Sequence, residues 1–78
     1  MKAVTIYSTP TCAYCKMAKE YFREKNVPYT EFNVAVDIER AQEMIEKSGQ
    51  MGVPVIDIGG KIVVGFNKPV IDQELELT

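Results

Sequence analysis

The chain of 78 residues predicts an α/β domain in which three helices cover a four-stranded mixed sheet. Its patterns follow the order β-α-β-α-β-β-α, and a strand–helix–strand start requires a parallel pair with a right-handed crossover. Near the C-terminal end, Gly59-Gly60 separates two β-branched runs, which indicates a hairpin and therefore antiparallel strands. Because a chain this short supports one small core, we expect residues 1–78 to form a single domain.

The first two elements are a strand and an amphipathic helix. Four of residues 3–7 are β-branched or aromatic, and the segment Ser8–Pro10 ends this strand. From Cys12 to about Lys25, apolar residues recur at helical spacing. Thr11 is the predicted N-cap, which would put the first cysteine in the first turn, and Asn26 is expected to end the helix. The predicted apolar stripe comprises Tyr14, Met17, Ala18, Tyr21 and Phe22.

A second strand and a second helix follow. Residues 29–34 alternate between apolar and polar side chains, as a half-buried strand does. Asp37 is the predicted N-cap of a helix from Ile38 to about Lys47, and Gly49 follows it at the C′ position. Its predicted inner face consists of Ile38, Ala41, Met44 and Ile45.

The last third of the chain contains the hairpin and a short helix. Residues 54–58 and 61–64 are the predicted strands, and both turn glycines tolerate positive φ. Asn67 is the expected N-cap of a helix that runs to about Leu75, with Pro69 near its start.

Composition and charge exclude several classes of function. A net charge of −2 and the lack of a basic run give no electrostatic footprint for nucleic acid. No apolar run approaches membrane-spanning length, and the first seven residues are too polar for a signal peptide. We therefore expect a monomeric protein of the cytoplasm that binds neither nucleic acid nor membrane.

The two cysteines, Cys12 and Cys15, lie two residues apart at the predicted helix start. Two are too few for the disulfide scaffold of a small secreted domain. The chain has no histidine and no second cysteine pair, so it lacks four ligands for structural zinc, and we expect no metal site. Free N–H groups at a helix start favour thiolate, the species that attacks disulfides. The alternative is an inert or structural pair, although a ring this short constrains little chain entropy.

Three motifs in this order resemble a glutaredoxin of the thioredoxin fold. They are Cys12-Ala13-Tyr14-Cys15 after the first strand, Val53-Pro54 before the hairpin, and Gly65-Phe66 before the last helix. The resemblance implies a cis Val53–Pro54 bond beside Cys12, with the backbone before the proline pairing with a bound peptide. From local sequence alone, a proline at the first residue of a strand needs no cis bond. The residues expected to bind substrate are Tyr14, Gly52, Val53, Pro54, Gly65, Phe66 and Asn67.

We expect the cysteine pair to act as a dithiol–disulfide oxidoreductase in two steps. Cys12, nearer the helix end, is the expected nucleophile and forms a mixed disulfide with the substrate. Cys15, one turn further in, then attacks the Cys12 sulfur and releases the reduced substrate. Without histidine, the helix end, backbone N–H groups and Lys16 or Lys19 must stabilise the thiolate.

The chain departs from glutaredoxins that use glutathione. Those carry Lys or Arg before the first cysteine, where this chain has Ser8–Thr11, and an Asp after the glycines, where this chain has Asn67. An amide cannot offer a carboxylate to the γ-glutamyl ammonium. The stretch Gly65–Pro69 is instead similar to the hydrogen donors of ribonucleotide reductase, which take electrons from thioredoxin reductase. We expect no tightly bound cofactor, disulfide-containing proteins as partners, and thioredoxin reductase or glutathione (as a co-substrate) as the reductant.

Four alternatives stay open. Phe66 is either an exposed contact for a protein partner or a core residue under the last helix. Tyr14 either flanks the substrate groove or packs in the helix stripe. The protein could be a dedicated electron donor to one partner, such as ribonucleotide reductase or a peroxidase. It could also bridge an iron–sulfur cluster, against which the weak glutathione site and the retained Cys15 argue.

Overall fold

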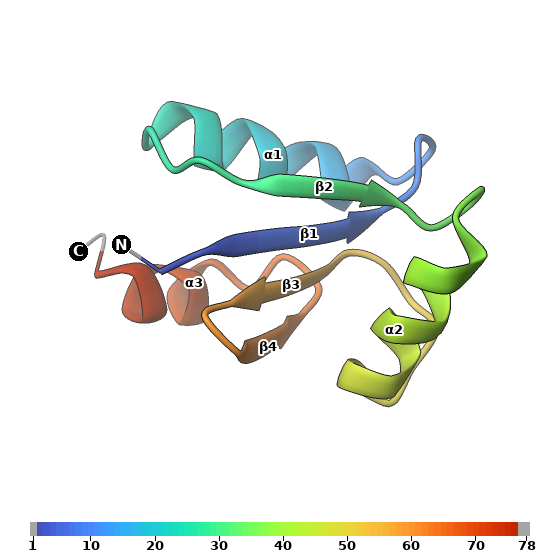
Figure 1. The fold of residues 1–78 in the computed structure, drawn as a ribbon. Helices are drawn as coiled ribbons and strands as arrows, with labels where there is room; N and C mark the ends of the chain where they lie inside the picture. Colours follow the sequence, from blue (N-terminus) through green and yellow to red (C-terminus); the bar gives the residue numbers. More distant parts are fainter. Residues whose placement is uncertain (1, 77–78) are drawn as a thin grey trace.

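The computed structural model describes residues 2–76, which form a four-stranded mixed sheet and three helices in the predicted order (Figure 1). The strands lie side by side in the order β2-β1-β3-β4. β1 and β2 run parallel, whereas β1–β3 and β3–β4 are antiparallel. The strand bounds are Val4–Ser8 for β1, Thr30–Asn33 for β2, Val55–Ile58 for β3 and Lys61–Val64 for β4. The predicted fold class is therefore confirmed.

The helices lie in two layers, one on each face of the sheet. Alternate residues of β1 point to opposite faces, so Val4 and Ile6 pack with α1 (Ala13–Glu24) and α3 (Lys68–Leu75). Tyr7 points to the other face, where it packs with Val55 and with Met44 of α2 (Ile38–Ser48). The larger core thus lies under α1 and α3. Its buried side chains are Val4, Ile6, Ala18, Tyr21, Phe22, Val27, Ile56, Ile58, Val63, Ile71 and Leu75.

The local start and turn signals are largely confirmed. Asp37 caps α2 by accepting a hydrogen bond of 3.1 Å from the N–H of Arg40, and Gly49 ends that helix at φ 75°. Gly59 and Gly60 have φ of 57° and 99°, as a type I′ hairpin turn requires.

Other local expectations are wrong in detail. β1 begins and ends one residue later than the predicted residues 3–7, and β2 is shorter than the predicted residues 29–34. Asn67 occupies the N-cap position of α3, but its side chain makes no capping hydrogen bond. Met17 leaves the buried stripe of α1 and is 47% exposed.

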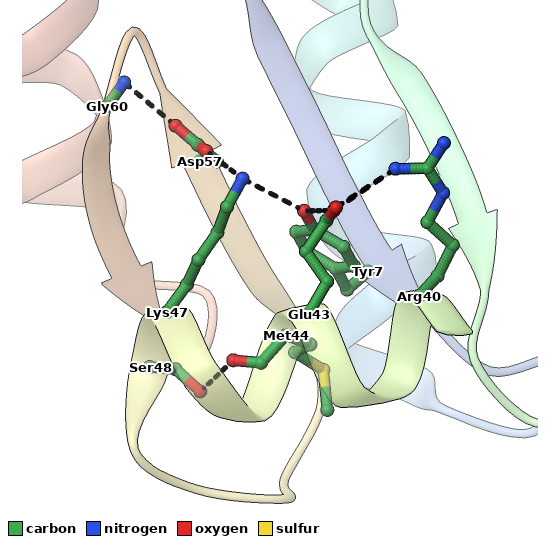
Figure 2. A network of polar contacts seen from close by, with 8 residues as sticks. All are labelled: Tyr7, Arg40, Glu43, Met44, Lys47, Ser48, Asp57 and Gly60. Atoms are coloured by element: carbon green, nitrogen blue, oxygen red, sulfur yellow. Dashed lines mark hydrogen bonds and ion pairs between the residues drawn. The ribbon is translucent and has the colours of Figure 1, made fainter. Parts of the chain in front are cut away.

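The predicted inner face of α2 is right for Met44 and wrong for Ile38 and Ile45. Met44 is the buried residue of this helix, whereas Ile38 is 73% and Ile45 37% exposed. The reason is that polar side chains of α2 also contact the sheet, and these contacts favour a different rotation of the helix about its axis. The Tyr7 hydroxyl donates to Glu43 across the interface between β1 and α2 (Figure 2).

A chain of ion pairs extends this contact on both sides. Arg40 lies 3.1 Å from Glu43, and its guanidinium stacks 4.1 Å from the ring centroid of Phe32. Lys47 donates to the Tyr7 hydroxyl at 3.2 Å and to Asp57 of β3 at 3.0 Å (Figure 2). One methionine and this polar network therefore hold α2 on its face of the sheet.

Candidate functional site

The two cysteines lie where β1 ends and α1 begins, at one end of the sheet (Figure 1). Cys12 itself, not Thr11 as predicted, is the N-cap of α1. Its backbone is extended, with φ −91° and ψ 114°, and its Sγ accepts a hydrogen bond of 3.2 Å from the N–H of Cys15. The sulfur thus takes the place that a serine or aspartate oxygen usually holds, where N–H groups favour negative charge.

Val53 and Pro54 lie beside this sulfur, as expected. The Cys12 Sγ is 3.8 Å from the carbonyl oxygen of Val53, to which the thiol donates. The Val53–Pro54 peptide bond is cis, and Pro54 is buried. The Pro54 carbonyl accepts a hydrogen bond of 2.8 Å from the N–H of Gly65. This bond ties the segment before β3 to the end of β4.

The second cysteine has a different environment. Cys15 is completely buried, and this burial raises the pKa of its thiol to about 11. The hydrogen bond with Cys12 raises that pKa further, whereas a backbone hydrogen bond from Thr9 and the charge of Lys19 lower it. Cys12 is partly exposed, and both cysteines are free thiols in the structure. The pair therefore combines one accessible sulfur with one shielded thiol that keeps its proton at neutral pH.

A groove of about 530 Å³ opens next to the pair. Tyr14 and Val53 link it to the cysteines, and its walls are mainly apolar. Its lining residues are Tyr14, Val53, Pro54, Val64, Gly65, Phe66, Asn67, Lys68 and Pro69. The structure thus brings together every residue expected to bind substrate except Gly52, which is exposed and outside the lining.

The structure places Tyr14 at the groove, and it places Phe66 partly in the core and partly in the groove. Tyr14 is 63% exposed, so it stands at the groove and not in the helix core. Phe66 is half-buried, and its ring meets Tyr21 edge-on with 5.8 Å between centroids. It packs against the core and also lines the groove.

Three lining residues were missed by sequence reasoning. Val64 ends β4 with 47% exposure, and Lys68 and Pro69 begin α3. An outward apolar residue directly before Gly65 was the available signal for Val64. Nothing in the local sequence indicated that a helix start would face the same groove.

Of the two lysines expected to act near the cysteines, Lys19 forms an ion pair. Its ammonium lies 2.7 Å from Glu31 of β2, and the Ser8 hydroxyl donates to the same carboxylate oxygen at 2.7 Å. These two contacts lower the pKa of Glu31, so the carboxylate stays charged at neutral pH. Lys16 is exposed.

Residues 2–76 offer neither a membrane-spanning helix nor a cluster of metal ligands. The described helices include none that is long and apolar enough to span a membrane. Within the same residues, His, Cys, Asp and Glu side chains form no group of three or more that could hold a metal ion.

Known proteins resemble this chain over nearly its whole length. A family model described as Glutaredoxin matches residues 4–63. A glutaredoxin-like 8.6 kDa protein from the rubredoxin operon of Clostridium pasteurianum is 52% identical over 73 residues, covering 94% of this chain and 97% of that protein. Glutaredoxin 3 of Escherichia coli K12 is 35% identical over 65 residues, covering 83% of this chain and 78% of that protein.

The solved structures agree with these relatives. A variant of the thioredoxin-like protein BC3987 superposes with a TM-score of 0.92 at 29% identity, covering 100% of both chains. The glutaredoxin of Archaeoglobus fulgidus, at 24% identity, shares the fold with a TM-score of 0.86, covering 96% of this chain and 87% of that one. Family model, relatives and fold lead to one conclusion: the chain belongs to the glutaredoxin family, whose members are thiol–disulfide oxidoreductases of the thioredoxin fold.

Proposed function

We propose that this protein reduces protein disulfides or mixed disulfides through Cys12 and Cys15. The observation that carries the proposal is the partly exposed Cys12 sulfur, which accepts the N–H of Cys15 at the start of α1. The buried Cys15 lies one turn further along the same helix, where it can reach the first sulfur. Family membership supports this chemistry.

The reaction has two balanced steps. The Cys12 thiolate attacks one sulfur of the substrate disulfide, so a mixed disulfide forms and the other substrate sulfur leaves as a thiolate. Cys15 then loses its proton and attacks the Cys12 sulfur, which releases the second substrate thiol. Two electrons have passed to the substrate, and the protein holds a Cys12–Cys15 disulfide. A reductant must return those electrons before the next cycle.

The groove supports a polypeptide substrate. An exposed aromatic ring at Tyr14 and the half-buried Phe66 offer apolar contact, and the backbone of Val53 offers pairing for an extended chain. The stretch before Cys12 carries no cation for a glutathione carboxylate, and Asn67 offers an amide in place of a carboxylate. These features also favour the second candidate, a dedicated electron donor to one protein partner.

We also propose that the protein is a monomer in the cytoplasm and binds no cofactor tightly. A reducing compartment supports such a role because the oxidised pair must be returned to thiols after every cycle. Thioredoxin reductase is the proposed reductant, with glutathione as the alternative.

Two cysteine variants test the chemistry. Cys12→Ser should abolish disulfide exchange, because the serine hydroxyl is not ionised at neutral pH. The matched variant Cys15→Ser should retain attack on a small mixed disulfide but lose reduction of a protein disulfide. Activity retained by the Cys12 variant would overturn the assignment of the nucleophile.

The electron source is tested by reducing the oxidised protein in two ways. One reaction contains NADPH and thioredoxin reductase, and the other contains glutathione, glutathione reductase and NADPH. We expect faster reduction in the first reaction. Faster reduction by glutathione would contradict the proposed reductant while leaving the cysteine chemistry intact.

A further inference from the structure

The burial of Cys15 hinders the second step of the reaction. Cys15 must lose a proton although it is completely buried, and burial raises the pKa of its thiol to about 11. A thiol is a poor nucleophile until that proton has left. Some group near Cys15 must therefore favour its thiolate during the second step.

The groups that act on the Cys15 thiol are Cys12 at the N-cap of α1, the backbone of Thr9 and the Lys19 side chain on α1. Behind them, Lys19 pairs with Glu31 of β2, and Glu31 also accepts a hydrogen bond from Ser8 at the end of β1. Lys19 is one helical turn beyond Cys15, the spacing at which side chains are neighbours on a helix surface. Its side chain is only 19% exposed, which is low for a lysine.

Lys19 is held in this position from the sheet. Glu31 pairs with Ile6 in the β1–β2 register, so it lies beside the strand that α1 covers. Its carboxylate oxygen receives both the Lys19 ammonium and the hydroxyl of Ser8, each at 2.7 Å. Ser8 is 1% exposed, so the anchor on which this arrangement depends is buried.

The mixed disulfide changes the balance at Cys15. Once the Cys12 sulfur is bonded to substrate, it can no longer carry the negative charge that opposes a second thiolate nearby. The effects that then remain are burial on one side, and the Thr9 hydrogen bond and the Lys19 charge on the other. Lys19 lies one helical turn beyond Cys15 on α1, so its positive charge opposes the effect of burial when the thiolate is needed.

We propose that Lys19 is a positioning residue for the second step, held by Glu31 and Ser8 so that its ammonium favours the Cys15 thiolate within the mixed disulfide. This inference rests on the proposed function. The proton of Cys15 passes to water, the new sulfur–sulfur bond forms with Cys12, and the departing substrate sulfur leaves with its electron pair and takes a proton from water. A small opening of about 260 Å³ lies beside this cluster, lined in part by Thr9, Lys19 and Glu31.

The test separates the two steps with an aromatic disulfide, 5,5′-dithiobis(2-nitrobenzoate). Attack by Cys12 releases one coloured thiolate, and the subsequent attack by Cys15 releases a second, so stopped-flow absorbance gives both rates. The variant is Lys19→Met, which keeps an unbranched side chain of similar length and removes the charge. Its matched control is Lys61→Met, an exposed lysine at the far end of the sheet, where β4 begins.

Lys19→Met should raise the pH midpoint of the second step by up to about half a unit, because the Lys19 charge is the weakest of the effects on Cys15 and is paired with Glu31. At neutral pH the second step should slow at most about twofold, because a more basic thiolate is also the better nucleophile. The first step should keep its rate, and Lys61→Met should leave both steps unchanged. Lys19→Arg, which keeps the charge, should bring the midpoint back toward that of the unaltered protein.

Three results would overturn the role of Lys19. They are an unmoved midpoint in a folded Lys19→Met variant, an equal movement in Lys61→Met, or the same movement in Lys19→Arg, which would indicate lost packing. If the unaltered protein released only one coloured thiolate, or none, the proposed function itself would fail instead. The two failures are therefore distinguishable.

Discussion

Raising the pH should destabilise the reduced protein through the buried thiol of Cys15. In the unfolded chain this thiol has its ordinary pKa of 9.0, whereas burial in the folded protein raises the pKa to about 11. A raised pKa means that the unfolded state loses its proton first. The stabilisation is therefore complete below about pH 9 and is lost as the pH rises toward 11.

The magnitude follows from these two values. A difference of about 2 pKa units corresponds to about 2.7 kcal/mol when the loss is complete. At pH 10, one unit above the unfolded value, about half of it, or about 1.4 kcal/mol, should already be lost. For a domain whose free energy of unfolding is about 5–15 kcal/mol, this is a measurable fraction.

Urea unfolding of the reduced protein at pH 7 and pH 10 measures the effect, with Cys15→Ala as the comparison. The variant loses some packing at every pH, but it lacks the titrating group. The tyrosines Tyr7 and Tyr21, whose pKa values are also raised, act equally in both proteins and cancel. Between the two pH values, the unaltered protein should lose about 1.4 kcal/mol more than the variant. Equal losses would refute the claim that burial of Cys15 controls its ionisation.

Three further predictions concern packing and the groove. Met44→Ala should lower the free energy of unfolding, measured by urea unfolding, by about 2–4 kcal/mol. Ile45 is partly exposed, so Ile45→Ala should lower it by less than about 1 kcal/mol. Similar losses in the two variants would contradict the observed orientation of α2. Tyr21→Phe removes the hydrogen bond to the buried Asp72 and should cost about 1–2 kcal/mol, seen as a fall in Tm, and an unchanged Tm would count against that bond. Phe66→Ala should lower kcat/KM for a peptide disulfide more than for a small aromatic disulfide, and equal losses would argue against a groove contact.

Features set by neighbouring residues were predictable from the sequence. The Gly59-Gly60 turn needs positive φ at both positions, and Asp37 caps a helix with its own side chain, so neither depends on distant parts of the chain. The cysteine pair was placed at a helix start by the same local signals. The choice between Thr11 and Cys12 as cap was not predictable, since either side chain can accept an N–H.

Features set by distant contacts were not predictable from local patterns alone. The periodicity of α2 allowed Ile38 and Ile45 to face the sheet, but the contacts of Tyr7 with Glu43 and Lys47 fix a different rotation. In the site, Val64 and Lys68 reach the groove from β4 and α3.

The Gly65–Pro54 hydrogen bond holds these groove walls together. The hydrophobic pattern of either segment carries no information about this bond, because its two partners are eleven positions apart in the chain. Local patterns alone therefore do not reveal the groove, whose expected residues came from the resemblance to glutaredoxins.

The sheet separates α2 from the thiol pair. Cys15 and Lys19 belong to α1 on one face of the sheet, whereas Glu43 and Lys47 hold α2 on the other. Substitutions along the outer surface of α2 can accumulate without disturbing the electrostatics of the thiol pair. We therefore expect single substitutions at exposed positions of α2 to leave the rate of disulfide exchange unchanged.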